Sequence, residues 1–468
     1  MGETFFAALR RHADADPDRP SLTIGDATLT RAEFVASVQH LAEAFRERGV
    51  TEGTWVTIAL PNCIEFVQSA WAAWLLGATP QPVSHRLPAS ERSAIIDLAD
   101  PALLVGEAHG DFPSMTAEEV AAAAAAPVEP GPEGGMAPEW KVLTSGGSTG
   151  RPKLIVAAAP ADAEVVKPLG LLLYVRPDEC VVNPGPMSHN APFVVMTVGL
   201  LLGNHMVVTP RFDAAQTLEL VQRHRADFLY LVPTMMLRIW RLENRADYDV
   251  SSLRVMFHMA APCPPWLKQE WIDWLGGEKI LELYGGTELQ ALTIITGTEW
   301  VEHRGSVGKA VIGEIVERDG ELWMRRGAGE PNAYRYVGAT AKSDGEGWES
   351  LGDLGYLDED GYVYISDRDT DMILVGGENV YPAEVEAAIE EHPAVRSSCV
   401  IGLPHEDLGS VPHAIIQLAS PVTDEELDAH LHERLVRYKL PRTFERSDEP
   451  LRDDAGKVRR SALRAARI

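Results

Sequence analysis

The chain has 468 residues, of which 45% are hydrophobic and 24% charged, and its formal net charge is −27. This length allows about three domains, or one large domain and a smaller one, and the composition is typical of a globular protein. The acidic balance argues against general attraction to nucleic acids or anionic membranes. A polyanionic ligand would therefore bind only where local donors and cations overcome the overall charge.

The four cysteines, Cys63, Cys180, Cys263 and Cys399, are far apart and form no C-x-x-C pair. We therefore expect neither a disulfide framework nor a zinc site, and a reducing compartment suits the chain. The N-terminal segment has charges throughout and no apolar core, unlike a signal peptide. The best apolar run, Val194 to Leu202, is too short to span a membrane. These features predict a cytoplasmic protein without membrane insertion.

Helical and strand-like segments alternate through the first third of the chain, as in a helix-flanked parallel sheet. Thr30 is a predicted N-cap for a helix that ends at Gly49. Further strands are predicted at 55–60, 78–82 and 103–105, and further helices at 64–76 and 90–98. Residues 115–138 contain six consecutive alanines, at 121–126, and then a Pro- and Gly-rich run, which predicts a surface connection.

The alternation resumes beyond residue 156 and then changes character. Strands are predicted at 179–183, 204–209, 228–232, 255–259 and 279–283, and helices at 214–225, 234–243 and 265–275. From Glu321 onward, short strands and hairpins are expected. A last α+β segment follows a boundary at about residue 368, with a helix at 382–391, strands near 396–401 and 413–417, and a helix at 424–436.

A loop rich in glycine and hydroxyl groups extends from Leu143 to Lys153, with the sequence LTSGGSTGRPK. Its glycines can adopt positive φ and let backbone N–H groups approach an anion. Its hydroxyls can donate hydrogen bonds, and Lys153 adds a positive charge. Flanking apolar residues predict strands, and Leu154 follows the lysine where a P-loop has Ser or Thr. A phosphate-binding loop and a flexible hairpin turn both remain open interpretations.

Two further segments place acidic residues beside glycines. The segment from Glu282 to Glu288 (ELYGGTE) follows a predicted strand, where ligands bind in open α/β sheets. Tyr284 offers a flat face for a base, and Glu288 is an oxygen ligand suited to Mg²⁺. Asp353 lies in a predicted Gly-flanked turn, where a carboxylate can accept two ribose hydroxyls. A Gly-Gly turn with a solvated glutamate and an ordinary β-turn explain the same residues without function.

Two segments near the C-terminus are also informative. A polar stretch from Asp367 to Asp371 leads into Met-Ile-Leu-Val, a Gly-Gly turn and a helix beginning at Pro382. This order predicts a linker and the first elements of a new domain. Lys457 follows a glycine in a polar loop, for which a solvated basic tail is the default interpretation.

Taken in order, these segments resemble the motifs of the adenylate-forming superfamily, which includes acyl-CoA synthetases, peptide-synthetase adenylation domains and firefly luciferase. The resemblance covers essentially the whole chain. It implies an α/β fold, with a large N-terminal domain of helix-flanked sheets plus a β-rich subdomain over residues 1–367. A small, mobile α+β C-terminal domain would follow over residues 368–468, with a hinge near 368–371.

The resemblance also implies an activity and its cofactors. ATP and a carboxylic acid would form an acyl-adenylate with release of pyrophosphate, and the acyl group would then pass to CoA as a thioester. Lys457, Glu288, Thr144 and His189 would be the catalytic residues, and Glu288 would bind Mg²⁺. Lys457 would bridge the carboxylate and the α-phosphate, which is electrostatic stabilisation of an in-line displacement.

The remaining roles follow from the same resemblance. The glycine-rich loop would hold the β- and γ-phosphates, the segment 260–262 and Tyr284 the adenine, Asp353 and Arg368 the ribose, and Gly376 and Gly377 the pantetheine of CoA. The full set of implied cofactor-binding residues is Thr144, Ser145, Gly146, Gly147, Ser148, Thr149, Gly150, Lys153, Ala260, Ala261, Pro262, Glu282, Leu283, Tyr284, Gly285, Gly286, Thr287, Asp353, Ile365, Arg368, Gly376 and Gly377.

The acyl pocket is implied by the same comparison of motifs. Its residues would be His189, Asn190, Val194, Phe257, Met259, Ala260, Gly285 and Gly286. His189 is equally explained as an ordinary loop histidine. Residues 186–196 contain no acid to bind an ammonium group, which disfavours an amino-acid substrate. The pocket segments are apolar, rich in small residues and contain methionine, which suits a bulky apolar acid. Their context is most similar to CoA ligases for bile or steroid acids.

One position departs from the family pattern and leaves the acceptor open. Thr370 occupies the hinge position, where Asp or Lys is usual, and this bears on the second half-reaction more than on adenylation. The leading hypothesis is an acyl-CoA synthetase, and the first alternative is an enzyme whose adenylate passes to a carrier protein or a partner enzyme. A catalytically silent nucleotide-binding protein is disfavoured by the intact Lys153, Glu288 and Lys457. Expected partners are small molecules, not nucleic acids, and a homodimer is allowed.

Overall fold

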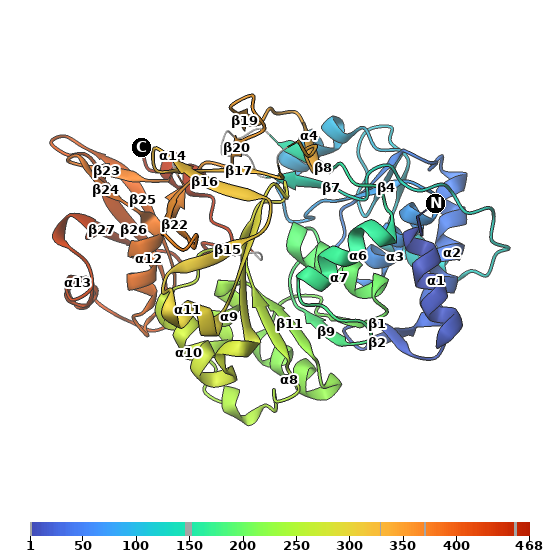
Figure 1. Ribbon diagram of the computed structural model, residues 1–468, viewed down its shortest axis with the longest axis horizontal. Helices are drawn as coiled ribbons and strands as arrows, with labels where there is room; N and C mark the ends of the chain where they lie inside the picture. Colours follow the sequence, from blue (N-terminus) through green and yellow to red (C-terminus); the bar gives the residue numbers. More distant parts are fainter. Residues whose placement is uncertain (1, 146–151, 328, 369–370, 454–455) are drawn as a thin grey trace.

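The computed structural model describes residues 2–145, 152–327, 329–368, 371–453 and 456–468 (Figure 1). The predictions for Gly146, Gly147, Ser148, Thr149 and Gly150, and for the hinge residue Thr370, fall outside these residues. The side chains of Ser145 and Arg368 are also outside the description.

A parallel sheet forms the centre of the large domain, in the strand order β13-β12-β11-β9-β10-β1. Its strands are nearly all buried, as expected where helices cover both faces. Their bounds are β1 (Pro20–Ile24), β9 (Cys180–Asn183), β10 (His205–Val208), β11 (Phe228–Leu231), β12 (Val255–His258) and β13 (Ile280–Gly285). The helices between them are α7 (Asn190–Leu201), α8 (Ala214–His224), α9 (Pro233–Trp240) and α10 (Pro265–Leu275).

This sheet continues into antiparallel strands beyond β13. In spatial order they are β14 (Leu292–Thr296), β15 (Ser306–Ile312), β22 (Val363–Arg368), β21 (Asp353–Leu357), β17 (Glu321–Arg325), β20 (Glu349–Ser350) and β19 (Lys342–Ser343), while β16 (Glu314–Arg318) pairs with β17. Helix α11 (Gly297–Glu302) lies between β14 and β15. The prediction of short strands and hairpins is confirmed, but Asp353 begins a strand and does not lie in a turn.

The N-terminal segments pack beside the central sheet. Strand β2 (Ala27–Thr30) pairs with β1, and a second parallel sheet has the order β4-β3-β5-β6. The remaining elements are α1 (Phe5–Ala15), α2 (Arg31–Glu47), β3 (Trp55–Ile58), α3 (Ile64–Leu75), β4 (Thr79–Pro82), α4 (Ala89–Ala99), β5 (Leu103–Val105) and β6 (Ser114–Met115). Thr30 caps α2 through a reciprocal bond with Glu33, as predicted.

The surface connection predicted at 115–138 is partly wrong, because helix α5 (Ala117–Ala125) occupies its first half. A capping box between Thr116 and Glu119 starts this helix. Val120 and Ala124 are buried against the rest of the domain, which stabilises a short alanine-rich helix that would be marginal alone. Helices α6 (Ala163–Leu172) and α7 were also not predicted, because α6 contains Pro168 and Gly170 and α7 lacks a polar face.

A small sheet carries the ends of the glycine-rich loop. The two predicted strands, β7 (Val142–Ser145) and β8 (Lys153–Ala157), form an antiparallel pair, and β18 (Tyr334–Val337) adds to β8. The strand β18 lies nearly 180 residues beyond β8 in the chain. Its pairing therefore brings part of the β-rich region onto the loop.

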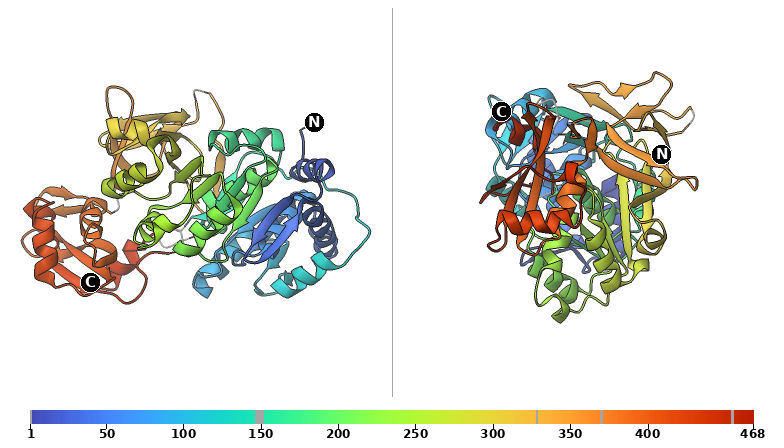
Figure 2. Two further views of the ribbon diagram at one scale, coloured as in Figure 1. Left: turned by 90° about the horizontal axis from the view of Figure 1, so that it is seen from below. Right: turned by 90° about the vertical axis from the view of Figure 1, so that its left-hand side faces the viewer.

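Residues 371–453 and 456–468 form a lobe with its own sheet and hydrophobic core, seen at one end of the molecule in Figure 2. The sheet order is β24-β23-β26-β25, with β27 on β26. The elements are β23 (Ile373–Val375), β24 (Glu378–Val380), α12 (Pro382–Glu390), β25 (Val395–His405), β26 (Gly409–Leu418), α13 (Asp424–His432), β27 (Thr443–Arg446) and α14 (Arg460–Ala465). The change of sheet falls between Arg368 and Ile373, and the boundary at 367/368 stays a prediction. Across the described part of the chain, no helix is long and apolar enough to cross a membrane.

Candidate active site

The predicted site residues gather where the central parallel strands end. The segments after β9, β11, β12 and β13 begin at the same edge of the sheet, which is where ligands bind in open α/β sheets. They carry His189, Thr234, Ala260 and Glu288, respectively. The central sheet thus brings together residues separated by about a hundred positions in the sequence.

Glu288 and Lys153 meet through a tyrosine that the sequence analysis missed. Tyr336 on β18 donates a hydrogen bond to Glu288 Oε1 at 2.6 Å, and Lys153 Nζ lies 3.0 Å from the Tyr336 hydroxyl. Lys153 Nζ is 3.7 Å from Glu288 Oε1 and sits over the Tyr336 ring. Burial and the nearby Glu288 carboxylate raise the pKa of Tyr336, so this hydroxyl stays protonated and donates. The alternation Tyr334-Arg-Tyr336 was the available sequence signal.

The Glu288 carboxylate suits the predicted magnesium ion. Its side chain is 6% exposed and lies beside the lysine of the phosphate loop. Magnesium in nucleotide sites is commonly held by one or two carboxylates together with substrate phosphates and water. No group of three or more metal-ligating side chains occurs among the described residues, and this donor set fits a nucleotide-bound ion. Thr144 Oγ1, at the start of the loop, is buried without a hydrogen-bond partner among those residues.

Asp353 and Tyr284 form the second cluster. The Tyr284 hydroxyl donates to Asp353 Oδ2 at 2.7 Å, and Asp353 lies directly opposite Arg368 in the pairing of β21 with β22. Ile365, also on β22, packs in the same hydrophobic cluster as Tyr284. The predicted base-stacking residue and the predicted ribose ligands are therefore neighbours.

The predicted adenine segment has a strained backbone. Ala260 has a φ of 80°, in the left-handed region that residues with a Cβ seldom adopt. Such strain persists only where the surroundings impose it, and it is concentrated at functional sites. On the facing segment, a Cβ at Gly286 would come within 2.7 Å of Glu288 Oε2 and 2.5 Å of Leu351 Cδ1. Any larger residue at position 286 would thus displace the Glu288 carboxylate or the Leu351 side chain.

Glu282 lies on strand β13, deeper than the other residues of its motif. Its carboxylate forms a buried ion pair with Lys268, and the buried His258 ring is 4.0 Å from Glu282 Oε1. Burial lowers the pKa of His258 to about 4, so the ring is neutral. Leu283 is also buried, while Gly285 and Thr287 lie nearer the surface.

The predicted acyl-pocket residues come from several elements, with His189 and Asn190 at the start of α7 and Phe257 on β12. Val194, Phe257 and Met259 are buried, and Phe257 packs edge-on against Phe228. Asn190 is polar and accepts a hydrogen bond from Lys141. Lys141, which the sequence analysis missed, is 7% exposed, and burial lowers its pKa to about 7. Its only sequence signal was a lysine next to an apolar strand.

The segment from Arg452 to Arg460, called the Lys457 loop below, contacts the large domain through its described residues. A Cβ on Gly456 would be 2.9 Å from Thr234 Oγ1, so the glycine touches the start of α9. Arg459 forms an ion pair with Glu91 on α4 at 2.9 Å, and the Arg241 guanidinium donates to the backbone oxygen of Glu390 at 3.0 Å. The exposed Lys457 is thereby placed at the carboxyl edge of the central sheet.

Gly376 and Gly377 form the tip of the hairpin between β23 and β24. Their φ values of 58° and 97° are both positive, as a two-residue turn of type I′ requires. The hairpin belongs to the C-terminal lobe, so its relation to the nucleotide residues depends on how that lobe is docked.

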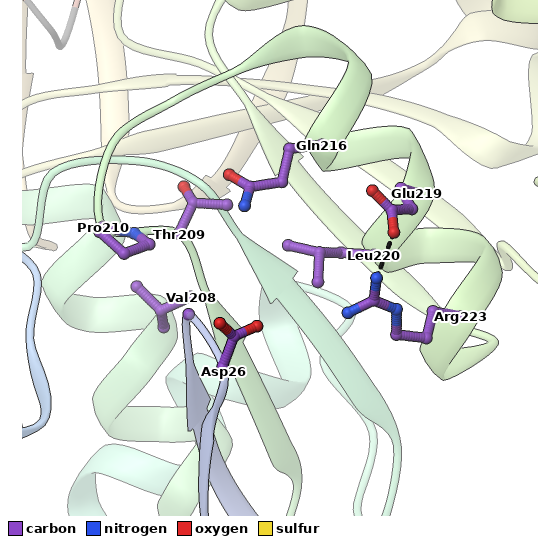
Figure 3. A pocket seen from close by; sticks show the side chains of 9 residues that line it. Asp26, Val208, Thr209, Pro210, Gln216, Glu219, Leu220 and Arg223 are labelled. Atoms are coloured by element: carbon purple, nitrogen blue, oxygen red, sulfur yellow. Dashed lines mark hydrogen bonds and ion pairs between the residues drawn. The ribbon is translucent and has the colours of Figure 1, made fainter.

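One pocket lies apart from these residues. It is lined by the β1–β2 turn, the end of β10 and helix α8, and Arg223 pairs with Glu219 at its rim (Figure 3). None of the predicted site residues lines it.

Comparison with known proteins shows to which family the chain belongs. Residues 9–330 match the AMP-binding enzyme family, and residues 384–457 match the AMP-binding enzyme C-terminal domain. The chain therefore belongs to the AMP-binding enzymes, and it is a ligase of the adenylate-forming superfamily, near the acyl-CoA synthetases. The predicted α/β fold with a large N-terminal and a small C-terminal domain is confirmed.

Particular relatives extend over the whole chain. It is 29% identical to the 2-succinylbenzoate–CoA ligase of Bacillus subtilis, over 98% of this chain and 97% of that protein. It is 28% identical to the long-chain-fatty-acid–CoA ligase FadD13 of Mycobacterium tuberculosis, over 94% and 93%. The structure of the B. subtilis o-succinylbenzoate CoA synthetase with its acyl-adenylate intermediate matches with a TM-score of 0.84, at 27% identity over 99% and 98%. Another structure of that synthetase contains ATP and a magnesium ion and matches with a TM-score of 0.82, at 27% identity over 97% and 98%.

Proposed function

We propose that this enzyme joins ATP and a carboxylic acid into an acyl-adenylate, releases pyrophosphate, and then transfers the acyl group to CoA. Two observations carry the proposal: Lys153 Nζ lies 3.7 Å from Glu288 Oε1, and Gly456, next to Lys457, contacts Thr234 at the start of α9. They support a phosphate-binding cation and a magnesium ligand side by side, with a second cation at the carboxyl edge of the central sheet. An in-line displacement at phosphorus needs this distribution of charge.

In the first step, a carboxylate oxygen attacks the α-phosphorus and the bond to the β-phosphate oxygen breaks. Lys153 and Thr144 hold the departing phosphates, and Lys457 stabilises charge between the carboxylate and the α-phosphate. Magnesium, held by Glu288, supplies neutralisation of the phosphate charge when bound. Tyr336 orients the Glu288 carboxylate through its 2.6 Å hydrogen bond. Asp353 binds the ribose and Tyr284 stacks on the adenine, next to the strained Ala260.

In the second step, the thiol sulfur of CoA attacks the acyl carbon and AMP leaves. Gly376 and Gly377 border the path of the pantetheine. The acid is bulky and largely apolar, which is supported by the apolar side chains of Val194, Phe257 and Met259 among the predicted pocket residues. The relatives named above act on 2-succinylbenzoate and long-chain fatty acids, which supports an acid of this size. The cytoplasm is the proposed compartment, and all four cysteines are free thiols.

The test is ATP–pyrophosphate exchange over a panel of aryl, polycyclic and long-chain acids, with a parallel assay for the CoA thioester. We expect acid-dependent exchange that falls by about two or more orders of magnitude in Lys457→Ala, because one preorganised charge contributes that much. No exchange with any acid would support a silent nucleotide-binding protein. Exchange without thioester would support an enzyme that delivers its adenylate to another acceptor.

A further inference from the structure

The Lys457 loop is held at both ends by arginines that share one carboxylate. Arg452, before the loop, donates to Glu386 Oε2 at 2.9 Å. Arg460, after the loop, donates to both oxygens of Glu386 at 2.8 Å. Glu386 lies on helix α12, more than sixty residues away in the sequence, and is 4% exposed.

Further hydrogen bonds connect Arg452 to the loop and Glu386 to the sheet beneath it. Arg452 donates to the backbone oxygen of Gly456, the residue before Lys457, at 3.3 Å. The backbone N–H of Val400 on β25 donates to Glu386 Oε1 at 2.8 Å, which fixes the carboxylate against the sheet. Arg460 also reaches Asp371 at 3.1 Å, beside the predicted hinge.

We infer that Glu386 is a positioning residue for adenylation, which sets where Lys457 is presented to the large domain. The inference rests on the proposed role of Lys457. The turn itself is closed by two hydrogen bonds between Asp453 and Lys457, each 2.9 Å. Since these bonds fix Asp453 and Lys457 relative to each other, the position of Lys457 within the C-terminal lobe depends on Arg452 and Arg460, and Glu386 holds both. Removing the shared charge leaves two largely buried guanidinium groups without their common partner.

The chain offers a matched control on the same helix. Glu390 lies one turn beyond Glu386 and is 6% exposed, but its hydrogen bonds go to the backbone and hydroxyl of Ser398. It forms a longer ion pair with Arg452, at 3.6 Å, and it has no ion pair with Arg460 among the described residues. Glu390→Gln therefore removes a buried carboxylate without releasing both ends of the loop.

The experiment compares the two half-reactions in Glu386→Gln and Glu390→Gln. Adenylation is measured by ATP–pyrophosphate exchange, and thioester formation is measured from supplied acyl-adenylate and CoA. We expect Glu386→Gln to lower the kcat of exchange about tenfold or more, since small misplacements of a catalytic group have such effects, while the KM for ATP and the thioester step stay unchanged. Glu390→Gln should leave both half-reactions unchanged.

A double variant identifies the route of the effect. In a Lys457→Ala background, Glu386→Gln should cause no further loss of exchange, because the group that it positions is gone. An additional loss of the same size, an equal loss in Glu390→Gln, or an equal loss in both half-reactions would overturn the inference. If Glu386→Gln does not fold, Arg460→Lys keeps the charge, breaks the two-point contact and applies the same test. Unchanged exchange in Lys457→Ala would instead refute the proposed role of Lys457.

Discussion

Lys141 is a buried lysine at the start of β7, and the described part of the chain gives it a neutral hydrogen-bond partner, Asn190. Lysine is among the residues least often buried without a carboxylate partner. The cost appears in its pKa, which burial lowers to about 7. Tyr336, by contrast, is an aromatic residue whose polar end is satisfied by Glu288 and Lys153. The protonation state of a buried residue in this site thus depends on the groups that contact it.

The lowered pKa of Lys141 predicts a pH dependence of stability. Between pH 7 and about 10.4, the unfolded chain holds this proton and the folded chain does not, so the free energy of unfolding rises with pH over that window. Below pH 7 the full penalty of a buried charge is present. Lys141→Met should therefore stabilise the protein relative to wild type most at pH 6, by at most about 5 kcal/mol.

Urea unfolding at pH 6, 7, 8 and 9 measures this difference. The advantage of Lys141→Met should shrink as the pH rises. Lys342→Met, which removes an exposed lysine, should show no such trend. A difference that is constant across this range would contradict the prediction.

Pairs of strands, rather than continuous segments, make up the site at the scale of elements. The pairing of β8 with β18 brings Lys153 to Tyr336, and the pairing of β21 with β22 brings Asp353 to Arg368. Each motif was visible in the sequence, but its register with a distant strand was not. The same holds for the hairpin between β23 and β24, whose two glycines have positive φ because the turn requires it.

The hairpin tip provides a prediction about the second half-reaction. Gly377 has a φ of 97°, and a Cβ there would meet no atom within 4 Å. Gly377→Ala should therefore cost about 1–2 kcal/mol of stability through backbone strain alone. If the hairpin borders the pantetheine path, this variant should also lower the rate of thioester formation severalfold while pyrophosphate exchange is retained.

Gly361→Ala is the matched control, because Gly361 has a φ of 82° and equally open surroundings in the β-rich region. Its loss of stability should be similar, without a specific effect on thioester formation. Equal kinetic effects of the two substitutions would argue against the proposed path. Stability is followed by urea unfolding, and the thioester by its release from acyl-adenylate and CoA.

At the scale of the whole molecule, polar contacts join the C-terminal lobe to the large domain. Described examples are the Arg459–Glu91 ion pair, the Arg241 hydrogen bonds to the ends of α12 and β25, and the contact of Gly456 with Thr234. The lobe has a separate hydrophobic core. Small, polar contacts between domains permit relative motion. In the position seen here, the C-terminal lobe places Lys457 at the large domain.

A charge exchange across this contact tests whether the arrangement serves adenylation. The Arg459–Glu91 pair is partly exposed, and such pairs contribute about 0.2–1 kcal/mol. Glu91→Arg should therefore lower pyrophosphate exchange by up to about fivefold, without slowing thioester formation from supplied acyl-adenylate. Adding Arg459→Glu should restore exchange. A loss that the double variant does not restore would exclude this ion pair as the cause.

The sequence alone determined the class of the protein and most of its elements. Hydrophobic periodicity and caps are local properties, so helix α2 and strands β7 to β13 were predicted close to their observed bounds, whereas β1 was not predicted. Lys153, Glu288, Asp353 and Lys457 were also predicted from the sequence, because each belongs to a motif of contiguous residues. Helix α5 was missed because its stability comes from burying Val120 and Ala124 against other segments, which no local pattern records.

Only the tertiary structure decided which distant groups share an environment. The pairing of β8 with β18 allows Tyr336 to donate its hydrogen bond to Glu288, and burial lowers the pKa of Lys141. Helix α12 provides Glu386, the carboxylate that binds both Arg452 and Arg460. These are consequences of non-local contacts, in which charge, hydrogen bonding and exclusion of water act through space. The chain order of the motifs identifies the reaction, and the packing of the two lobes determines where its lysine is placed.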